Sequence, residues 1–256
     1  MNKLKNNRVG EIRRMNCGEE CEIIKYINAS DIYVKFKETN KEFRGNYEAF
    51  CGGKIKDTFL PTVCGVGYIG YETVKEDDKY LQSYKSWRQI LIRGYDKTFK
   101  EKNKSYSDCL VWDEWSYYGD FKKWFNENYY EVEGEQMHID KDILYKGNKI
   151  YSPKTCCYVP QRINTLFTKS NVLRGKYPIG VSYRKDINKF ISRCSVFNNG
   201  KKQNVHLGRF KTPIEAFSAY KEFKENYIKQ VADEYKDKIP IKLYEAMYNY
   251  IVEITD

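Results

Sequence analysis

The most strongly patterned stretch of the chain covers residues 179–217 and reads IGVSYRKDINKFISRCSVFNNGKKQNVHLGRFKTPIEAF. Three runs within it alternate apolar and polar residues, and turn-forming clusters at 185–188 and 198–200 separate them. Alternation with a period of two is typical of strands that bury one face, and Asn-Gly is a favoured hairpin turn. The pattern predicts three antiparallel strands, at 179–183, 189–196 and 203–210.

A helix is predicted directly after the third strand. Thr212, Pro213 and Glu215 form its start signal. A threonine at the N-cap and a glutamate three residues later each bind a backbone amide of the other, and proline fits the first helical position. Four aromatic residues then recur at helical spacing and predict an apolar face that covers the sheet. They are Phe217, Tyr220, Phe223 and Tyr227.

Four parts of this stretch carry a family resemblance: Gly180-Val181, Lys189-Phe190, Leu207-Gly208-Arg209-Phe210, and Thr212-Pro213 with Glu215-Ala216 and Ala219-Tyr220. They resemble the APETALA-type (ethylene-response-factor) DNA-binding domain, a three-stranded antiparallel sheet backed by one helix. The resemblance implies that the outward face of the sheet enters the major groove of double-stranded DNA, which is wide enough for strands. Carried over position by position, the base-reading residues are Ser182, Arg184, Arg193, Ser195, Asn204 and His206.

The basic residues of this domain are assigned two kinds of DNA contact. Arg184 and Arg193 are the candidates for bidentate hydrogen bonds to guanine. The phosphate contacts are expected from Lys189, Lys201 and Lys202. The plant family has arginines and tryptophans at some positions where this chain has Ser, Asn or His, so the target sequence does not carry over. For His206, a half-buried structural position is the alternative to a DNA contact.

A second informative segment covers residues 137–167. Residues 137–144 predict a strand with acidic residues near its end, and a Lys-Gly-Asn turn leads towards a return strand. Pro160 fits the first turn of a following helix. The predicted order of strand, loop, strand and helix puts Asp140 at the end of the first strand and Asn164 on the helix.

Asp140 and the spacing of residues 155–159 into Ile163-Asn164 resemble the ββα-metal (His-Me finger) unit of HNH endonucleases, in particular the phage homing type. The resemblance implies that Asp140 and Asn164 are catalytic ligands of Mg²⁺ or Mn²⁺, ions that suit oxygen donors. The metal would stabilise the leaving 3′-oxygen while a nearby base deprotonates the attacking water.

The chain departs from the HNH pattern at the general base. The family has a histidine directly after the aspartate, and here that position is Lys141, which we expect to stay protonated between Asp140 and Asp142. His138 shares the strand face of Asp140 and is the candidate substitute base. Thr155 replaces the family's loop asparagine. Three interpretations stay open: a nuclease with a relocated base, a slow or substrate-assisted nuclease, and an inactive fold kept for DNA binding.

The rest of the chain is expected to form supporting units. Residues 1–60 predict a small, barrel-like antiparallel β domain, with alternating runs at 22–27 and 32–37. Residues 61–75 predict a linker, because no helix pattern opens on its glycines as a dinucleotide-binding fingerprint requires. Residues 76–172 predict a helical part joined to the HNH-like unit, and residues 173–256 predict the DNA-binding domain with a last helix.

The aromatic residues of the central helices have two interpretations. Trp87 lies in one predicted helix, and Phe121, Trp124 and Phe125 form a stripe on the next. A stripe at helical spacing is more often core than a platform on which bases stack. We therefore expect these side chains in the interior.

The composition limits the classes of protein to which this chain can belong. The chain has 256 residues, of which 41% are hydrophobic and 16% aromatic, enough for a packed core. Forty-five Lys and Arg against 35 Asp and Glu give a formal net charge of +10, which favours a polyanionic partner such as nucleic acid. No apolar run is long enough for a membrane span, and no signal peptide is recognised, so a cytoplasmic location is expected, in the bacterial host if the protein is phage-encoded.

The eight cysteines predict free thiols more than disulfides in a reducing compartment. A zinc site is the alternative for Cys17, Cys21, Cys51 and Cys64, although the chain contains no Cys-x-x-Cys motif.

Together these observations predict an α+β protein with an N-terminal β unit, a central helical and ββα-metal-like unit, and a C-terminal three-stranded sheet with one packed helix. The expected function is sequence-specific binding of double-stranded DNA, with cutting or nicking that depends on Mg²⁺ or Mn²⁺. The alternative is a DNA-binding regulator without activity, or a phage inhibitor of a host factor, in which case a protein partner is expected.

Overall fold

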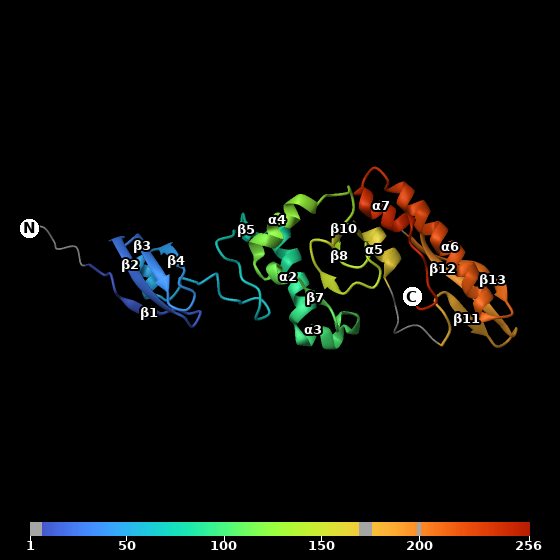
Figure 1. Cartoon of the computed structure of the whole chain (residues 1–256), viewed down its shortest axis with the longest axis horizontal. Helices are drawn as coiled ribbons and strands as arrows, with labels where there is room; N and C mark the ends of the chain where they lie inside the picture. Colours follow the sequence, from blue (N-terminus) through green and yellow to red (C-terminus); the bar gives the residue numbers. More distant parts are fainter. Residues whose placement is uncertain (1–6, 169–175, 199–200) are drawn as a thin grey trace, which may run out of the picture. The chain divides into compact units, whose positions relative to one another are not determined.

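The computed structural model describes residues 7–168, 176–198 and 201–256, in two compact units, Met1–Glu127 and Asn128–Asp256 (Figure 1). The fold class is α+β, as predicted, and the sheets include a three-stranded antiparallel one. The predicted domain divisions near residues 60, 75 and 172 stay predictions. Residues of the predicted 76–172 unit contribute to both compact units.

The first unit begins with a four-stranded antiparallel sheet in which neighbours in sequence are neighbours in space. Two of its strands match the predicted runs at 22–27 and 32–37. Cys21, Ile23, Val34 and Phe36 alternate with more exposed residues and form the core under one face. The elements are β1 (Ile12–Arg14), β2 (Glu20–Asn28), β3 (Asp31–Phe36), β4 (Glu42–Gly45) and the short helix α1 (Tyr47–Cys51).

The helical part of the first unit packs around its aromatic residues. Trp87, Trp115 and Phe121 are fully buried, so the stripe is core, as expected. The predicted linker makes backbone hydrogen bonds, with Gly67 N to Val63 O at 2.8 Å and Tyr68 N to Ser116 O at 2.9 Å. The elements are β5 (Lys75–Glu76), β6 (Lys79–Tyr80), α2 (Gln82–Tyr95), α3 (Lys97–Lys102), a 3-10 turn (Lys104–Tyr106), β7 (Leu110–Val111), a second 3-10 turn (Asp113–Ser116) and α4 (Tyr118–Asn128).

The second unit opens with the segment in which the sequence predicts an HNH-like unit. Its elements are β8 (Met137–Asp140), β9 (Ile150–Tyr151), β10 (Cys157–Pro160) and α5 (Gln161–Phe167). β8 pairs antiparallel with β10, and α5 packs against both. The first strand ends at Asp140 rather than continuing to residue 144, because the chain turns there. Pro160 is the N-cap of α5, next to the predicted position.

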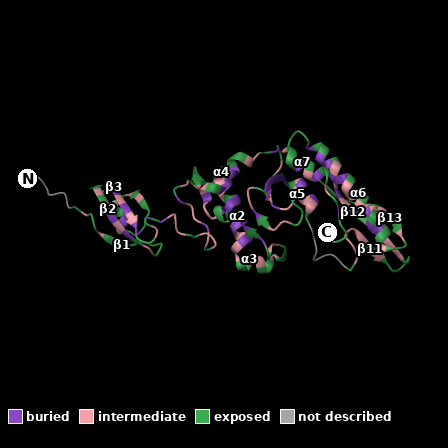
Figure 2. Ribbon diagram, in the orientation of Figure 1, coloured by how far each residue is buried: buried purple, intermediate pink, exposed green. Residues whose placement is uncertain are grey.

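The second unit ends with a three-stranded antiparallel sheet and two helices, β11 (Val181–Arg184), β12 (Lys189–Asn198), β13 (Lys201–Phe210), α6 (Pro213–Glu234) and α7 (Ile241–Tyr248). The capping box is present in full: Thr212 accepts from Glu215 N, and Glu215 accepts from Thr212 N. Cys194, Phe217 and Tyr220 form the core between β12 and α6, where buried residues gather (Figure 2). Of the predicted 198–200 turn, residues 199–200 lie outside the described residues.

Side chains join the two parts of the second unit. Arg162 of α5 binds Glu234 of α6 at 2.6 Å, and the rings of Phe167 and Tyr250 meet edge to face at 4.8 Å between centroids. Arg162 and Glu234 are both partly exposed, so packing rather than the ion pair dominates this contact. Across the described residues, no helix is both long and apolar enough to cross a bilayer.

Candidate nucleic-acid interface and candidate metal site

The face of the three-stranded sheet turned away from α6 carries the predicted DNA-reading residues. Paired residues point to the same side of a sheet, and side chains alternate along each strand. Arg193 pairs with His206, Ser195 with Asn204, and Phe197 with Lys202. On the other edge, Ser182 pairs with Ile191 and Arg184 with Lys189. Cys194 and Val196 alternate with these residues and are buried towards α6, which fixes the first set as the outward face.

The solvent exposure of the predicted residues agrees with this strand register. Most of the predicted residues are exposed, and Lys189 and Ser195 are half-buried. The exposed ones are Ser182, Arg184, Arg193, Lys202, Asn204 and His206. The structure therefore brings all the predicted contact residues except Lys201 onto one face, while their role in DNA contact stays a prediction. Lys201 is exposed but falls one residue out of phase with this face.

A β-bulge places Arg209, which the sequence analysis did not single out, on the outward face of the sheet. The register shifts between Ser192 and Arg193, so that Ser192 pairs with Gly208 and Ile191 with Arg209. Arg209 thereby joins the outward face, where it is exposed, although strict alternation from His206 would put it on the helix side. Gly208 has φ +145°, a conformation that glycine adopts readily. A glycine inside a strand pattern was the available signal of a bulge.

Two side-chain contacts order this face. The Arg184 guanidinium holds Asp186 with two hydrogen bonds of 2.8 and 2.6 Å, and it lowers the pKa of the Asp186 carboxyl. About half of each side chain is exposed, so the pair is weak and can exchange for another anion. Ser195 Oγ donates a hydrogen bond to Asn204 Oδ1 at 2.6 Å. The Asn204 amide nitrogen is not used in this contact and can donate to another partner.

The charged side chains at the described strand positions of the outward face are all basic. Its basic side chains come from all three strands: Arg184, Lys189, Arg193, Lys202 and Arg209. The strand positions that share this face in the described residues include no Asp or Glu. A surface of this kind attracts a polyanion, and its Ser, Asn and His side chains can exchange hydrogen bonds with base edges.

The candidate metal site starts from Asp140, at the end of β8. Its Oδ1 accepts hydrogen bonds from the backbone N–H groups of Asp142 at 2.8 Å and Ile143 at 2.7 Å, so this oxygen forms the turn that ends the strand. Its Oδ2 accepts no hydrogen bond from the described residues. One carboxylate oxygen is therefore structural, and the other is available to a ligand.

Burial raises the pKa of Asp140 to about 6, and the nearby Asp142 carboxylate acts in the same direction. The two backbone hydrogen bonds and Lys141 oppose the shift. A carboxylate that is costly to ionise in the fold gains from a cation at its unused oxygen. A cation bound there would have to displace the carboxyl proton below about pH 6.

The other predicted residues of this site lie as follows. His138 and Asp140 are the half-buried residues of β8 and alternate with the buried Met137 and Ile139. They therefore share one side of the strand, as predicted. Asn164 is half-buried on α5, and its side-chain amide has no hydrogen-bond partner among the described residues. Since α5 packs on β8, the structure brings the elements of Asp140 and Asn164 together.

Lys141 is the residue that the predicted HNH resemblance puts at the general-base position. It is 7% exposed, its Nζ lies 3.5 Å from Asp142 Oδ1, and it stands 5.7 Å from the centre of the Tyr151 ring. Thr155, at the family's asparagine position, donates to Ile150 O at 2.7 Å and thus stabilises its own loop.

The cysteines do not gather into a metal site in the described part of the chain. No group of three His, Cys, Asp or Glu side chains there is arranged to hold a metal ion, and the cysteines described are free thiols. Cys21, one of the proposed zinc ligands, is fully buried in the β1–β4 core, and burial raises the pKa of its thiol to about 12. It acts as a small apolar core residue.

Comparison of the chain with protein-family models, with curated proteins and with solved structures gave no match.

Proposed function

We propose that the outward face of β11–β13 binds double-stranded DNA in the major groove with sequence preference. The observation that carries this proposal is the one-sided basic face, in which Arg193 lies opposite His206 and Ser195 opposite Asn204. Arginine and asparagine are the side chains best suited to guanine and adenine edges, and the surrounding lysines suit phosphates. The resemblance to the APETALA-type domain supports the same docking.

Binding is tested by selecting duplexes from a random DNA library with the full chain. We expect enrichment of a common motif. Arg193→Ala is then expected to weaken binding to the selected duplex by about 1–3 kcal/mol and to relax the preference at one base pair. Lys229→Ala, on α6 where the lysine lies over the Tyr248 ring of α7, is the control and should bind as the parent does. No enriched motif, or equal affinity of the Arg193 variant, contradicts the proposal.

We further propose that the β8–β10–α5 unit cuts or nicks the bound DNA with Mg²⁺ or Mn²⁺. The available Oδ2 of Asp140 and the amide of Asn164 would hold the ion, which supplies stabilisation of the leaving oxygen. His138, on the same side of β8 as Asp140, is the side chain proposed to take the proton from the attacking water.

A DNA-binding protein without activity is the second candidate, and the burial of Lys141 in an ion pair at the base position favours it. The nuclease and the inactive DNA-binding protein are distinguished by incubating the full chain, in the presence of Mg²⁺ or Mn²⁺, with a plasmid that carries the selected motif. The nuclease proposal expects cleavage that Asp140→Ala and Asn164→Ala abolish without loss of DNA affinity. If the parent makes no breaks with either metal, the inactive binder is the function.

A further inference from the structure

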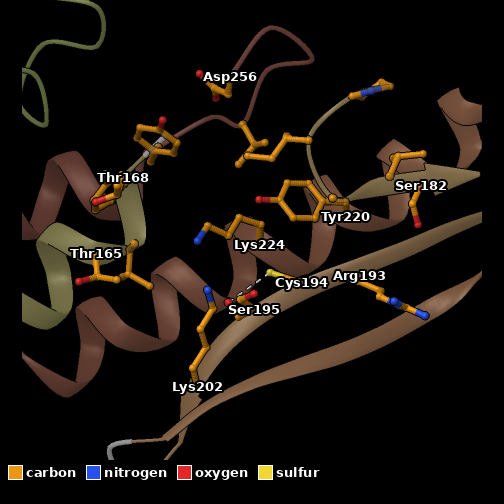
Figure 3. A pocket seen from close by; sticks show the side chains of 18 of the residues that line it. Thr165, Thr168, Ser182, Arg193, Cys194, Ser195, Lys202, Tyr220, Lys224 and Asp256 are labelled. Atoms are coloured by element: carbon orange, nitrogen blue, oxygen red, sulfur yellow. Dashed lines mark hydrogen bonds between the residues drawn. The ribbon is translucent and has the colours of Figure 1, made fainter. Parts of the chain in front are cut away.

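The second unit contains a cavity whose wall includes Arg193, Ser195 and Lys202 of the proposed DNA-binding face. It has a volume of about 460 Å³ and lies between the end of α5, the start of β11, the free edge of β12 and the side of α6 (Figure 3). β11 pairs with β12 only as far as Ser192, so the β12 residues beyond it border the cavity. This volume lies within the range of small-molecule sites.

Cationic side chains from separate elements border this cavity. They are Arg193 of β12, Lys202 of β13 and Lys224 of α6. Figure 3 shows the amino groups of Lys202 and Lys224 directed into the same space, on the side where Thr165 of α5 and Thr168, directly after α5, lie. Like charges that converge in a partly enclosed space repel each other unless an anion lies between them.

Lys224 has no ion pair or hydrogen bond among the described residues. Burial lowers the pKa of its amino group, and the nearby Cys194 thiol acts in the opposite direction. Asp256 is the acidic residue on the cavity wall, but its Oδ2 already binds Lys146 at 2.7 Å. The lysine therefore lacks a described protein counter-ion.

Another part of the wall is apolar and rich in rings. Phe167 and Tyr250 meet edge to face at 4.8 Å, and Tyr177, Tyr220 and Val252 continue the surface. Flat side chains of this kind bind planar, weakly polar groups. The cavity thus has a cationic end and an aromatic wall. These two features suit a ligand that carries an anionic group attached to a planar ring.

We propose that this cavity binds a small organic phosphate with a planar ring, of the class of nucleoside monophosphates. Lys224 is the main phosphate contact, Lys202 assists it, and the aromatic wall holds the ring. The cavity borders Arg193 and Lys202 of the proposed DNA-binding face. Lys224 on α6 is not one of the DNA-reading positions, so its substitution tests the cavity separately from the proposed function.

The test is calorimetric titration of the full chain with the four common nucleoside monophosphates, the matching nucleosides, and inorganic phosphate. We expect at least one monophosphate to bind, with its nucleoside and inorganic phosphate each at least about tenfold weaker. Lys224→Met is expected to weaken the monophosphate about ten- to hundredfold, and Lys224→Arg by only a few-fold. Lys229→Met, on the same helix but away from the cavity, is the matched control.

Thermal unfolding of Lys224→Met checks that the fold is kept, and removal of an uncompensated charge should not lower the melting temperature. The proposal is overturned if none of the four monophosphates binds, if nucleoside or inorganic phosphate binds as tightly as the monophosphate, or if Lys224→Met binds like the parent. A loss of duplex DNA affinity in Lys224→Met equal to its loss for the monophosphate also overturns it, because the cavity would then belong to the DNA path.

Discussion

Asp140 determines how the candidate metal site responds to pH. Its folded pKa of about 6 exceeds the value of about 3.9 in an unfolded chain, so the folded state holds the proton more tightly. Without metal, the free energy of unfolding is therefore expected to fall as the pH rises from about 4 to about 6 and then to level off. The cost arises because ionisation places a charge in a buried position beside Asp142.

Asp140→Asn tests this expectation. The amide oxygen can still accept the N–H groups of Asp142 and Ile143, but it carries no charge. We expect the variant to be more stable than the parent near pH 7, with the difference vanishing near pH 4, in urea unfolding without divalent ions. The exposed Asp237→Asn is the control and should keep the parent's pH profile. An unchanged profile in Asp140→Asn would show that Asp140 is not the titrating group.

Ser192 is a buried polar residue without a described partner. It is 0% exposed on β12, and its Oγ has no hydrogen bond among the described residues. Ser192→Ala removes a desolvated hydroxyl, so we expect the free energy of unfolding to rise by up to about 1 kcal/mol in chemical denaturation. A decrease of similar size would mean that the hydroxyl is hydrogen-bonded in the folded protein. Ser182→Ala, on the exposed side of β11, should leave stability unchanged.

Some residue positions follow from the sequence, and others do not. A period of two was enough to put His138 and Asp140 on one side of a strand. The ion pair of Lys141 and the turn held by Asp140 Oδ1 depend on the backbone path of 141–143, which no periodicity encodes. The sequence therefore predicted which residues the segment offers, but not that one carboxylate oxygen is structural.

Gly180 fixes how the start of β11 packs on α6. Its φ is +77°, and a Cβ there would lie 2.1 Å from Tyr220 Cδ2. Gly180→Ala must therefore strain the backbone and displace a buried ring, and we expect a loss of about 2–4 kcal/mol in the free energy of unfolding. Gly147→Ala is the matched control: its φ is +83°, but nothing lies within 4 Å of the added Cβ. It should lose only about 1–2 kcal/mol. Equal losses would contradict the packing of Gly180 on Tyr220.

At the level of elements, strong local signals predicted the C-terminal part well. The three strands and the capping box of α6 follow from alternation and from Thr212 and Glu215. The bulge at Ser192 was missed, because it is set by pairing between two strands rather than by either strand alone. That shift is what adds Arg209 to the outward face.

At the scale of the whole molecule, the strand and helix patterns of the sequence predicted the fold class but not the division of the chain. The α+β class and the buried aromatic stripe agree with the sequence. The boundary between Glu127 and Asn128 falls at the end of a helix, where no proline, glycine or charge run marks a linker. Such a boundary depends on which surfaces pack together, which the sequence pattern does not reveal.

The central claim is that the outward sheet face, rather than net charge, binds DNA. Its most direct test compares the affinities of two charge-matched double variants for the selected duplex. Arg193→Glu with Arg209→Glu reverses the sheet face, and Lys229→Glu with Lys236→Glu reverses the same charge on and just beyond α6. We predict at least about a hundredfold loss for the first and only a few-fold loss for the second. Equal losses in the two variants would contradict the account.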